Sequence, residues 1–246
     1  MPGEGFVEFV GAAFRLRDGR AILDGLSLAV AEGETVALIG RSGSGKTTAL
    51  KMTNGMLRPT LGQVLVEGRS TAEWDPIRLK RHIGYVIQEV GLFPHFTIAE
   101  NVGLVPRLEG WKPEDIGRRV DELLEMVGLP AGEFRGRYPR QLSGGQRQRV
   151  GVARALAADP ALLLFDEPFG ALDPVTRREL QDQFLALRRD VGRTAIFVTH
   201  DVREALRLGS RIAVLAGGRV ETILPAGEFR SAQTGEARAF LKALED

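Results

Sequence analysis

A glycine-rich run, GRSGSGKT at residues 40–47, constrains the fold of this chain more than any other stretch. It matches the pattern GxxxxGK[ST] in full. The segment before the run, Thr35–Ile39, is predicted to be a strand, and the segment after it, Thr47–Met56, a helix. The expected order is therefore strand, loop and helix. Glycines let successive backbone N–H groups converge on phosphate oxygens, and the helix directs its positive end to the same point. The sequence therefore predicts a phosphate-binding loop made of Gly40, Arg41, Ser42, Gly43, Ser44, Gly45, Lys46, Thr47 and Thr48.

Two side chains of this loop carry the expected chemistry. The Lys46 ammonium is predicted to reach the β- and γ-phosphates of a nucleotide, and the Thr47 hydroxyl to bind Mg²⁺. The alternative is a glycine-rich turn before an ordinary helix. The complete pattern and its flanking segments favour the phosphate loop.

A pair of acidic residues follows a buried strand later in the chain. The apolar run Ala161–Phe165 ends at Asp166 and Glu167, which is typical of a parallel strand whose carboxyl end lies at the ligand-binding edge of an α/β sheet. We expect Asp166 to hold Mg²⁺, directly or through water, and Glu167 to orient or deprotonate an attacking water. An isolated Asp-Glu pair is more often a solvated turn, and the upstream phosphate loop is what favours a functional pair here.

Two further polar residues follow predicted strands. Gln88 comes after Ile83–Ile87, and His200 comes after Ala195–Thr199. If these strands are parallel neighbours, His200 can hydrogen-bond the γ-phosphate, and Gln88 can contact Mg²⁺ or the attacking water. Taken singly, each is better explained as a satisfied polar group at a strand end. The candidate catalytic set is therefore Glu167, His200, Gln88 and Lys46.

Strands and helices alternate along most of the chain, which predicts an α/β domain. From Gly5 to about Leu38, short apolar runs alternate with turn signals, and a hairpin is expected at Asp18-Gly19. Residues 96–157 have a helical character, with helices expected at Thr97–Val105 and Pro113–Val127, and are predicted to be an inserted lobe. Later elements are a helix opened by Asp173-Pro174, a strand at Thr194–Thr199, a helix at Asp201–Leu208 and a hairpin around Gly217-Gly218.

Composition excludes several classes of protein. The formal net charge is +1, from 33 basic and 32 acidic residues, so no global field favours nucleic acid or an acidic membrane surface. The absence of cysteine excludes disulfides, thiolate metal sites and cysteine nucleophiles. No apolar run approaches the roughly 18 residues needed to span a bilayer. A membrane role is therefore expected to come through a partner.

The run LSGGQ, Leu142–Gln146, is a second candidate donor surface. Its Ser143, Gly144 and Gly145 are predicted to open a helix. Because the phosphate loop already supplies donors and a cation, we expect this helix start to receive a γ-phosphate from a second copy of the chain. The alternative is a plain N-cap followed by glycines. On the same helix, a solvated face is expected for three arginines, Arg147, Arg149 and Arg154.

Together these motifs resemble the nucleotide-binding subunit of ATP-binding cassette (ABC) transporters over nearly the whole chain. The resemblance implies, in chain order, a Walker A loop at Gly40–Thr48, a Q-loop Gln88, a signature at Leu142–Gln146, a Walker B strand at Leu162–Asp166 with the catalytic Glu167, a D-loop at Ala171-Leu172-Asp173 and a switch His200. It implies ATP hydrolysis with ATP and Mg²⁺ bound, the metal ligands being Thr47, Gln88 and Asp166. It also implies a head-to-tail homodimer in which ATP lies between the Walker A loop of one copy and Ser143, Gly144, Gly145 and Gln146 of the other.

The resemblance implies the fold as well. A single ABC ATPase domain is expected over residues 1–246, in the α/β class, with a P-loop NTPase core and an N-terminal antiparallel β subdomain in residues 1–95 and 158–246. The inserted α-helical subdomain is expected in residues 96–157. Family members place an aromatic ring against adenine, and the matching position here is Leu16, with Phe14 two residues earlier on the same strand face. These two residues are the candidate adenine contacts.

Within the family, Arg81–Gln88, Gly91–Ile98 and Val105-Pro106 are similar to importers of glycine betaine, choline and related quaternary amines. This implies a peripheral subunit on the cytoplasmic face of the membrane, with permease subunits and, indirectly, a solute-binding protein as partners and no nucleic acid. A coupling helix of the permease would dock on Phe93, Pro94 and Phe96, although a surface turn beside core aromatics is the competing explanation. The alternative functions are a soluble ABC ATPase outside transport and an importer of another small solute such as an amino acid.

Overall fold

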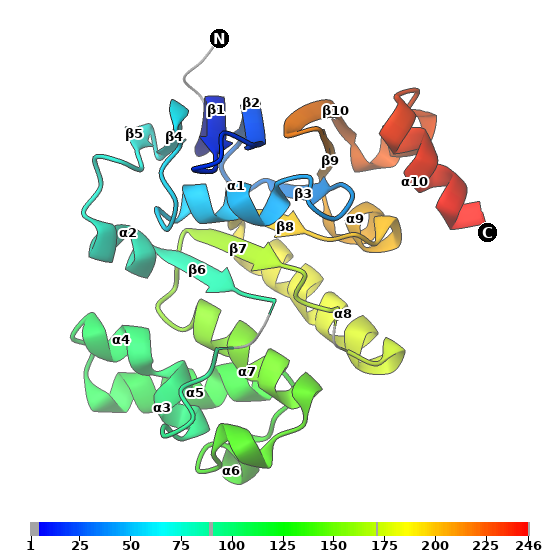
Figure 1. Ribbon diagram of the computed structural model, residues 1–246. Helices are drawn as coiled ribbons and strands as arrows, with labels where there is room; N and C mark the ends of the chain where they lie inside the picture. The colour runs from blue at the N-terminus through cyan, green and yellow to red at the C-terminus, as the bar shows by residue number, and fades with distance from the viewer. Residues whose placement is uncertain (1–4, 89–90, 171, 246) are drawn as a thin grey trace. The chain divides into compact units, whose positions relative to one another are not determined.

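The computed structural model describes residues 5–88, 91–170 and 172–245, and these form two compact units (Figure 1). The first unit combines Met1–Lys80 with Gly192–Asp246, and the second is Arg81–Val191. The chain passes into the second unit within α2 (Pro76–His82) and leaves it directly after α8 (Pro174–Val191). The first unit is therefore built from both ends of the sequence.

An antiparallel sheet forms one part of the first unit (Figure 1). Its strand order is β2-β1-β4-β5, with bounds Val7–Arg15 for β1, Ala21–Val30 for β2, Leu61–Val66 for β4 and Arg69–Ser70 for β5. Buried Leu26, Leu28 and Val30 alternate with exposed residues along β2, as expected for a sheet with one face on the core. The hairpin predicted at Asp18-Gly19 is confirmed, because β1 and β2 pair on either side of it.

Three parallel strands and one antiparallel strand form the other sheet of the first unit, in the order β10-β9-β3-β8. Its strands are β3 (Thr35–Ile39), β8 (Thr194–Val198), β9 (Arg211–Ala216) and β10 (Arg219–Pro225). β3 runs parallel to both β8 and β9, and β10 closes an antiparallel hairpin on β9. Every residue of β3 and β8 is buried, the pattern of strands covered on both faces. The unit is completed by α1 (Lys46–Thr53), α9 (Val202–Leu208), the 3₁₀ helix Ala226–Ser231 and α10 (Gly235–Glu245).

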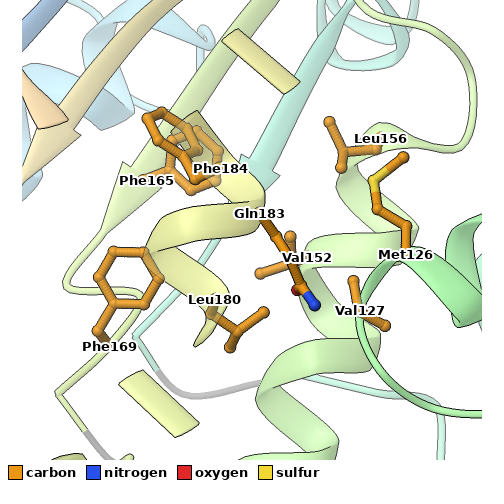
Figure 2. A pocket seen from close by; sticks show the side chains of 9 residues that line it. All are labelled: Met126, Val127, Val152, Leu156, Phe165, Phe169, Leu180, Gln183 and Phe184. Atoms are coloured by element: carbon orange, nitrogen blue, oxygen red, sulfur yellow. The ribbon is translucent and has the colours of Figure 1, made fainter. Parts of the chain in front are cut away.

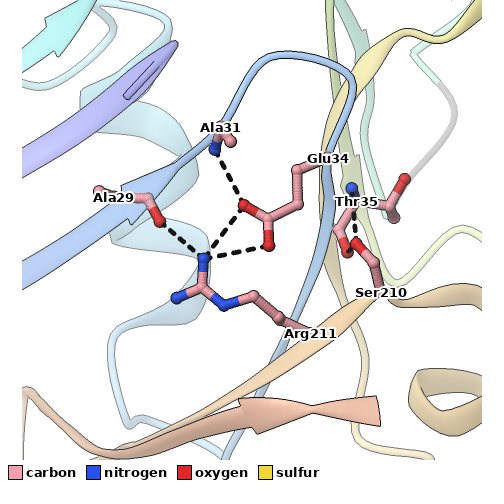
Figure 3. Close-up of polar contacts among 6 residues, drawn as sticks. All are labelled: Ala29, Ala31, Glu34, Thr35, Ser210 and Arg211. Carbon is pink, nitrogen blue, oxygen red and sulfur yellow. Dashed lines mark hydrogen bonds and ion pairs between the residues drawn. The ribbon is translucent and has the colours of Figure 1, made fainter. Parts of the chain in front are cut away.

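A polar cluster fixes the entry of β3 into this sheet (Figure 3). Arg211 Nη1 donates to both carboxylate oxygens of Glu34, at 3.0 and 3.1 Å, and to the carbonyl of Ala29 at 3.3 Å. The hydroxyl of Ser210 accepts from the Thr35 N–H at 3.1 Å and donates to the Thr35 carbonyl at 2.8 Å. These contacts join the start of β9 to the start of β3. They therefore fix the position of β3 along the strand direction, and with it the point at which the glycine-rich loop begins.

Short helices make up most of the second unit. They are α3 (Ile98–Val102), α4 (Leu104–Leu108), α5 (Pro113–Met126), α6 (Ala131–Phe134), the 3₁₀ helix Pro139–Gln141 and α7 (Gly144–Leu156), and α3, α5 and α7 contact one another (Figure 1). The single helix predicted over Thr97–Val105 is wrong, because the structure has two helices divided at Gly103. The physical reason is Pro106, which offers no N–H to continue the hydrogen-bond ladder of α3.

Two parallel strands, β6 (Ile83–Val86) and β7 (Leu162–Asp166), complete the second unit together with α8. Their register runs from Ile83↔Leu162 to Val86↔Phe165, and α7 packs against β6. The predicted cap of α8 is confirmed: Asp173 Oδ1 accepts from the N–H groups of Val175 and Thr176, at 3.1 and 3.0 Å. The hydrogen bonds from Thr176 hold the pKa of Asp173 below its ordinary value.

Aromatic packing supports the carboxyl end of β7. The rings of Phe165 and Phe184 meet edge to face with centroids 5.0 Å apart. Around them lies an apolar cavity of about 20 Å³, shown in Figure 2, which is lined by Met126, Val127, Val152, Leu156, Phe165, Phe169, Leu180, Gln183 and Phe184. A volume of this size holds about one water-sized sphere, so β7 rests on an almost fully packed core.

Candidate functional site

The glycine-rich loop folds back on its own lysine. Lys46, the first residue of α1, is 7% exposed. Its ammonium donates to the carbonyls of Gly40 at 2.7 Å and Arg41 at 3.0 Å. Lys46 therefore holds a positive charge at the mouth of the loop while it closes the loop's first turn.

Close backbone approach explains two of the loop glycines. A Cβ on Gly40 would lie 2.4 Å from the Leu215 carbonyl oxygen, and a Cβ on Gly45 would lie 2.9 Å from the Ile22 carbonyl oxygen. Gly45 also has φ of 103°, which L-residues rarely adopt. Side chains at these positions would push the loop off the sheet, so the glycines are required for the loop's position.

The start of α1 is available to an anion. Its N-cap is Gly45, which has no side chain to cap the first turn, and a helix N-terminus of this kind favours an anion. Within the described part of the chain, the buried hydroxyl of Ser44 also has no hydrogen-bond partner. Ser42 and Gly43 are exposed, whereas Thr47 and Thr48 are half-buried. The loop thus presents donors, a cation and an orphaned hydroxyl, which fits a phosphate group.

The structure brings His200 to the same edge of the sheet as the loop. β3 and β8 are parallel neighbours with Leu38 opposite Val198. Gly40 and His200 each lie two residues beyond that pair, and His200 is exposed. Parallel strands end at a common edge, so the strand arrangement that the prediction for His200 required is present. The role of His200 itself stays a prediction.

In the second unit, the paired carboxylates follow β7 as predicted. Asp166 is 4% exposed at the end of the strand. Glu167 has φ of 48°, in the left-handed region that non-glycine residues rarely occupy. Such a conformation costs about 1–3 kcal/mol and is found most often where geometry serves function. Because of this turn, Glu167 does not follow the alternation of side chains between the two faces of the sheet that holds along β7.

Each carboxylate has a different donor from the β6 segment. Gln88 Nε2 donates to Glu167 Oε2 at 3.3 Å, so the structure brings together these two predicted catalytic residues. The phenol of Tyr85 lies 3.4 Å from Asp166 Oδ2. Burial, the Asp166 charge and this hydrogen bond raise the pKa of Tyr85 above its ordinary value. The sequence analysis missed Tyr85, although its place in a strand parallel to β7 was a signal for it.

The LSGGQ run begins α7 as predicted. Ser143 is the N-cap, and its hydroxyl accepts from the Gln146 N–H at 3.2 Å while Gln146 Oε1 accepts from the Ser143 N–H at 2.9 Å. This reciprocal capping box matches the plain N-cap alternative. Ser143 and Gly144 are nevertheless exposed, so the capped helix start still faces outward.

The prediction of a solvated face for three arginines of α7 is wrong. Arg147 donates to the Leu142 carbonyl at 2.8 Å, and Arg149 to the Val127 carbonyl at 3.1 Å. Arg154 donates to the Gly91 carbonyl at 2.7 Å, and burial lowers its pKa. Each long arginine side chain reaches a backbone carbonyl near or beyond the end of α7, and donates a hydrogen bond to it. They fasten the signature and the segment after Gln88 to α7.

The expectation that Phe14 and Leu16 lie on the same strand face is also wrong. Phe14 lies in β1, but the strand ends at Arg15. The Leu16 N–H donates to the Arg20 carbonyl, and the Leu16 carbonyl accepts from the Gly19 N–H, both at 2.9 Å. Leu16 therefore belongs to the turn that reverses the chain, because the tight hairpin needs its backbone groups.

An aromatic cluster lies on the surface of the second unit. Phe93 is 42% exposed, and the rings of Phe93 and His95 lie 5.3 and 4.6 Å from that of Phe96 between centroids. Fully buried Asn101 holds this turn from α3: its amide Oδ1 accepts from the Phe93 N–H at 2.8 Å, and its Nδ2 donates to the carbonyls of Phe93, Phe96 and Thr97 at 2.9–3.2 Å. A single side chain thus orders the whole turn.

Replacing Asn101 with Ala is expected to lower the free energy of unfolding by about 2–4 kcal/mol, because it leaves buried backbone donors and acceptors unpaired. Chemical denaturation measures this loss, and limited proteolysis should reveal faster cleavage around Phe93. Asn101→Asp keeps the volume but places a carboxylate against carbonyl oxygens, so it should be no better tolerated. A loss below about 0.5 kcal/mol for the alanine variant would show that Asn101 does not hold the turn.

The remaining predicted site features are placed as follows. Lys46, Thr47 and His200 lie in the first unit, and Gln88, Asp166, Glu167 and the signature lie in the second. Of the D-loop, Ala171 lies outside the described residues, and Asp173 caps α8. No helix in the described part is long and apolar enough to cross a membrane.

No group of three or more His, Asp or Glu side chains is arranged to hold a metal among the residues with described positions. Mg²⁺ does not need such a cage, because proteins usually bind it with one or two carboxylates and substrate phosphates. The buried carboxylate of Asp166 and the hydroxyl of Thr47 are oxygen donors of the required kind. Each side chain by itself therefore has the donor chemistry of a Mg²⁺ ligand, and their joint use in one site stays a prediction.

Comparisons with known proteins agree with this chemistry. The matching family model, for an ABC transporter, covers residues 23–170. The osmoprotectant import ATP-binding protein OsmV of Salmonella typhimurium is 48% identical over 230 residues, covering 90% of this chain and 60% of that protein. The glycine betaine/carnitine/choline transport ATP-binding protein OpuCA of Bacillus subtilis is 46% identical with the same coverage. The chain thus spans about 60% of the length of these curated relatives.

A solved structure also resembles the chain. It is the dimeric, post-hydrolysis state of an ATP-binding cassette bound to ADP and Pi, with a TM-score of 0.83 and 35% sequence identity. The likeness covers 89% of this chain and 98% of that one. The fold of this chain therefore has a counterpart in a nucleotide-bound protein.

Proposed function

Because this chain belongs to the ABC transporter family, we propose that it is the ATP-binding and ATP-hydrolysing subunit of an importer. The family, the cassette fold and the likeness to quaternary-amine importers agree with the expectations from the motifs. The observation that carries the activity is the loop, where Lys46 and the uncapped start of α1 offer a cation and N–H donors around one point. A polyphosphate with the charge of ATP suits this cradle.

Phosphoryl transfer to water needs little covalent chemistry from the protein, so positioning and charge dominate. Lys46 and the loop N–H groups bind the phosphates, Glu167 orients the attacking water and accepts its proton, and His200 donates to the γ-phosphate. Thr47, Asp166 and Gln88 would hold Mg²⁺, which when bound would neutralise charge on the phosphate oxygens. Phe14 in β1 and Leu16 in the turn that follows it are the proposed adenine contacts, although they do not share a strand face.

The second copy of the chain supplies the rest of the nucleotide site. Ser143, Gly144, Gly145 and Gln146 of one protomer close over the γ-phosphate held by Lys46 of the other. The start of α7 supports this role, because Ser143 and Gly144 are exposed there and the N-terminal end of a helix favours an anion. A related cassette is dimeric with ADP and Pi bound.

Cross-linking tests the sandwich cleanly, because the chain has no native cysteine. Ser42→Cys is placed on one copy and Ser143→Cys on a second copy that carries a size tag. In the presence of ATP and Mg²⁺ and a Glu167→Gln background, a short thiol cross-linker should give a mixed-size dimer. Ser27→Cys, at an exposed serine of β2, replaces Ser143→Cys as the control and should give none. Equal products with and without ATP would contradict the nucleotide sandwich.

The transported solute is a quaternary amine of the glycine betaine, choline or carnitine type. The support is similarity to proteins named for those solutes. The chain would sit peripherally on the cytoplasmic face of the membrane, bound to permease subunits that receive solute from a binding protein. The turn held by Asn101, with exposed Phe93 and Pro94, offers the permease an apolar contact.

Uptake by the assembled transporter tests this function directly. Vesicles holding the chain, its permease and its binding protein should accumulate labelled glycine betaine or choline only with ATP and Mg²⁺. The solute should also stimulate ATP hydrolysis. Hydrolysis without uptake of any quaternary amine would reject the solute and keep the ATPase, whereas absence of hydrolysis would reject the activity itself.

A further inference from the structure

Tyr85 lies beside Asp166, and neither the motifs nor the likenesses above give it a role. We propose that Tyr85 is a positioning residue that holds the Asp166 carboxylate in the orientation in which it binds Mg²⁺. The inference rests on the proposed ATPase function, since it assigns a residue to the same site. It concerns only residues of the second unit.

The register of two strands brings the pair together. In the parallel pairing of β6 with β7, Tyr85 lies opposite Leu164. Asp166 comes two residues after Leu164, so it shares the face of the sheet with Leu164 and Tyr85. Diagonal neighbours on one face are within reach of an aromatic side chain. A residue as long as tyrosine is therefore needed at position 85 to touch Asp166.

The direction of the hydrogen bond is determined by protonation. An ionised carboxylate can only accept, so the phenol O–H must donate to Asp166 Oδ2, which lies 3.4 Å away. A phenol ordinarily loses its proton only at about pH 10, so Tyr85 can act as the donor at neutral pH. This bond limits rotation of a carboxylate that is already 4% exposed.

The β6 segment also separates the tasks of the two adjacent acids. Tyr85 engages Asp166, whereas Gln88, three residues later, engages Glu167. One carboxylate thus has its donor within the strand and the other beyond its end. The donor of Asp166 is thus distinct from the donor of Glu167, and hydrogen bonds of this kind orient metal ligands.

Removing the phenol oxygen tests the proposal. In a Glu167→Gln background that preserves bound ATP, Mn²⁺ binding to the protein–ATP complex is measured by electron paramagnetic resonance of the free ion. Loss of a hydrogen bond to a metal ligand costs about 10–100-fold in metal affinity. Because 3.4 Å is long for an O–H···O bond, Tyr85→Phe is expected to weaken Mn²⁺ binding about tenfold.

Two controls separate positioning from structure. Tyr138→Phe removes the hydroxyl of the chain's other tyrosine, which is exposed in the second unit, and should leave Mn²⁺ affinity unchanged. ATP binding by Tyr85→Phe in EDTA, where no metal is present, should also equal that of the background protein. The proposal is overturned if Tyr85→Phe changes Mn²⁺ affinity less than about twofold, a difference of roughly 0.4 kcal/mol, or if metal-free ATP binding falls as much as Mn²⁺ binding. If the background protein binds no ATP at all, the proposed function fails instead.

Discussion

Replacing Glu167 with Gln is expected to reduce ATP hydrolysis by at least about a hundredfold, because general-base catalysis typically contributes 10²–10⁴-fold. Glutamine keeps the size of the side chain and an oxygen that can accept the Gln88 hydrogen bond, now at 3.3 Å. It cannot take a proton from water. ATP binding should therefore persist, and the closed dimer should accumulate.

Phosphate release and size-exclusion chromatography with ATP and Mg²⁺ measure the two outcomes. Glu114→Gln makes the same chemical change at an exposed position in the first turn of α5. This control should hydrolyse ATP at the rate of the unmodified chain. Normal hydrolysis by Glu167→Gln would show that another group activates the water.

Replacing Lys46 with Ala is expected to weaken ATP binding on the order of a hundredfold. Hydrogen bonds to charged groups contribute about 1.5–3 kcal/mol each, and Lys46 is the buried cation of the loop. The substitution also removes the donor that closes the loop through the Gly40 and Arg41 carbonyls. Both losses act on the phosphate cradle.

Isothermal titration calorimetry with a non-hydrolysable ATP analogue measures the affinity. Lys51→Ala serves as the matched control, because Lys51 is a half-buried lysine in the last turn of the same helix. Its affinity should stay within about threefold of the unmodified chain, which is less than 1 kcal/mol. Similar affinities for Lys46→Ala and the unmodified chain would remove Lys46 from the phosphate site.

Local sequence patterns predicted much of the fold. The glycine-rich loop, the hairpin at Asp18-Gly19 and the Asp173 cap of α8 each depend on residues that are close together in the chain. Turn chemistry and capping act over a few residues, so a single sequence carries the signal. Where a local signal conflicted with a proline, as at Pro106, the predicted helix was wrong.

Exposure of long side chains was harder to predict. Arg147, Arg149 and Arg154 have the spacing and charge of a solvated helix face, yet each donates to a backbone carbonyl. The acceptor for Arg154 lies 63 residues away at Gly91. A pattern along one helix does not indicate which loops bring their carbonyls to it.

The sequence by itself determined which chemical groups this protein has and the local elements that present them: the phosphate loop before α1, the acids after β7 and the capped start of α7. Only the tertiary structure decided which of these side chains contact one another. Tyr85 contacts Asp166, 81 residues later in the chain, because β6 and β7 pair in one particular register. The backbone of Glu167 adopts a positive φ, which no local sequence pattern indicated. Strand register and backbone strain depend on packing between segments that are distant in the sequence, so a pattern of neighbouring residues does not predict them.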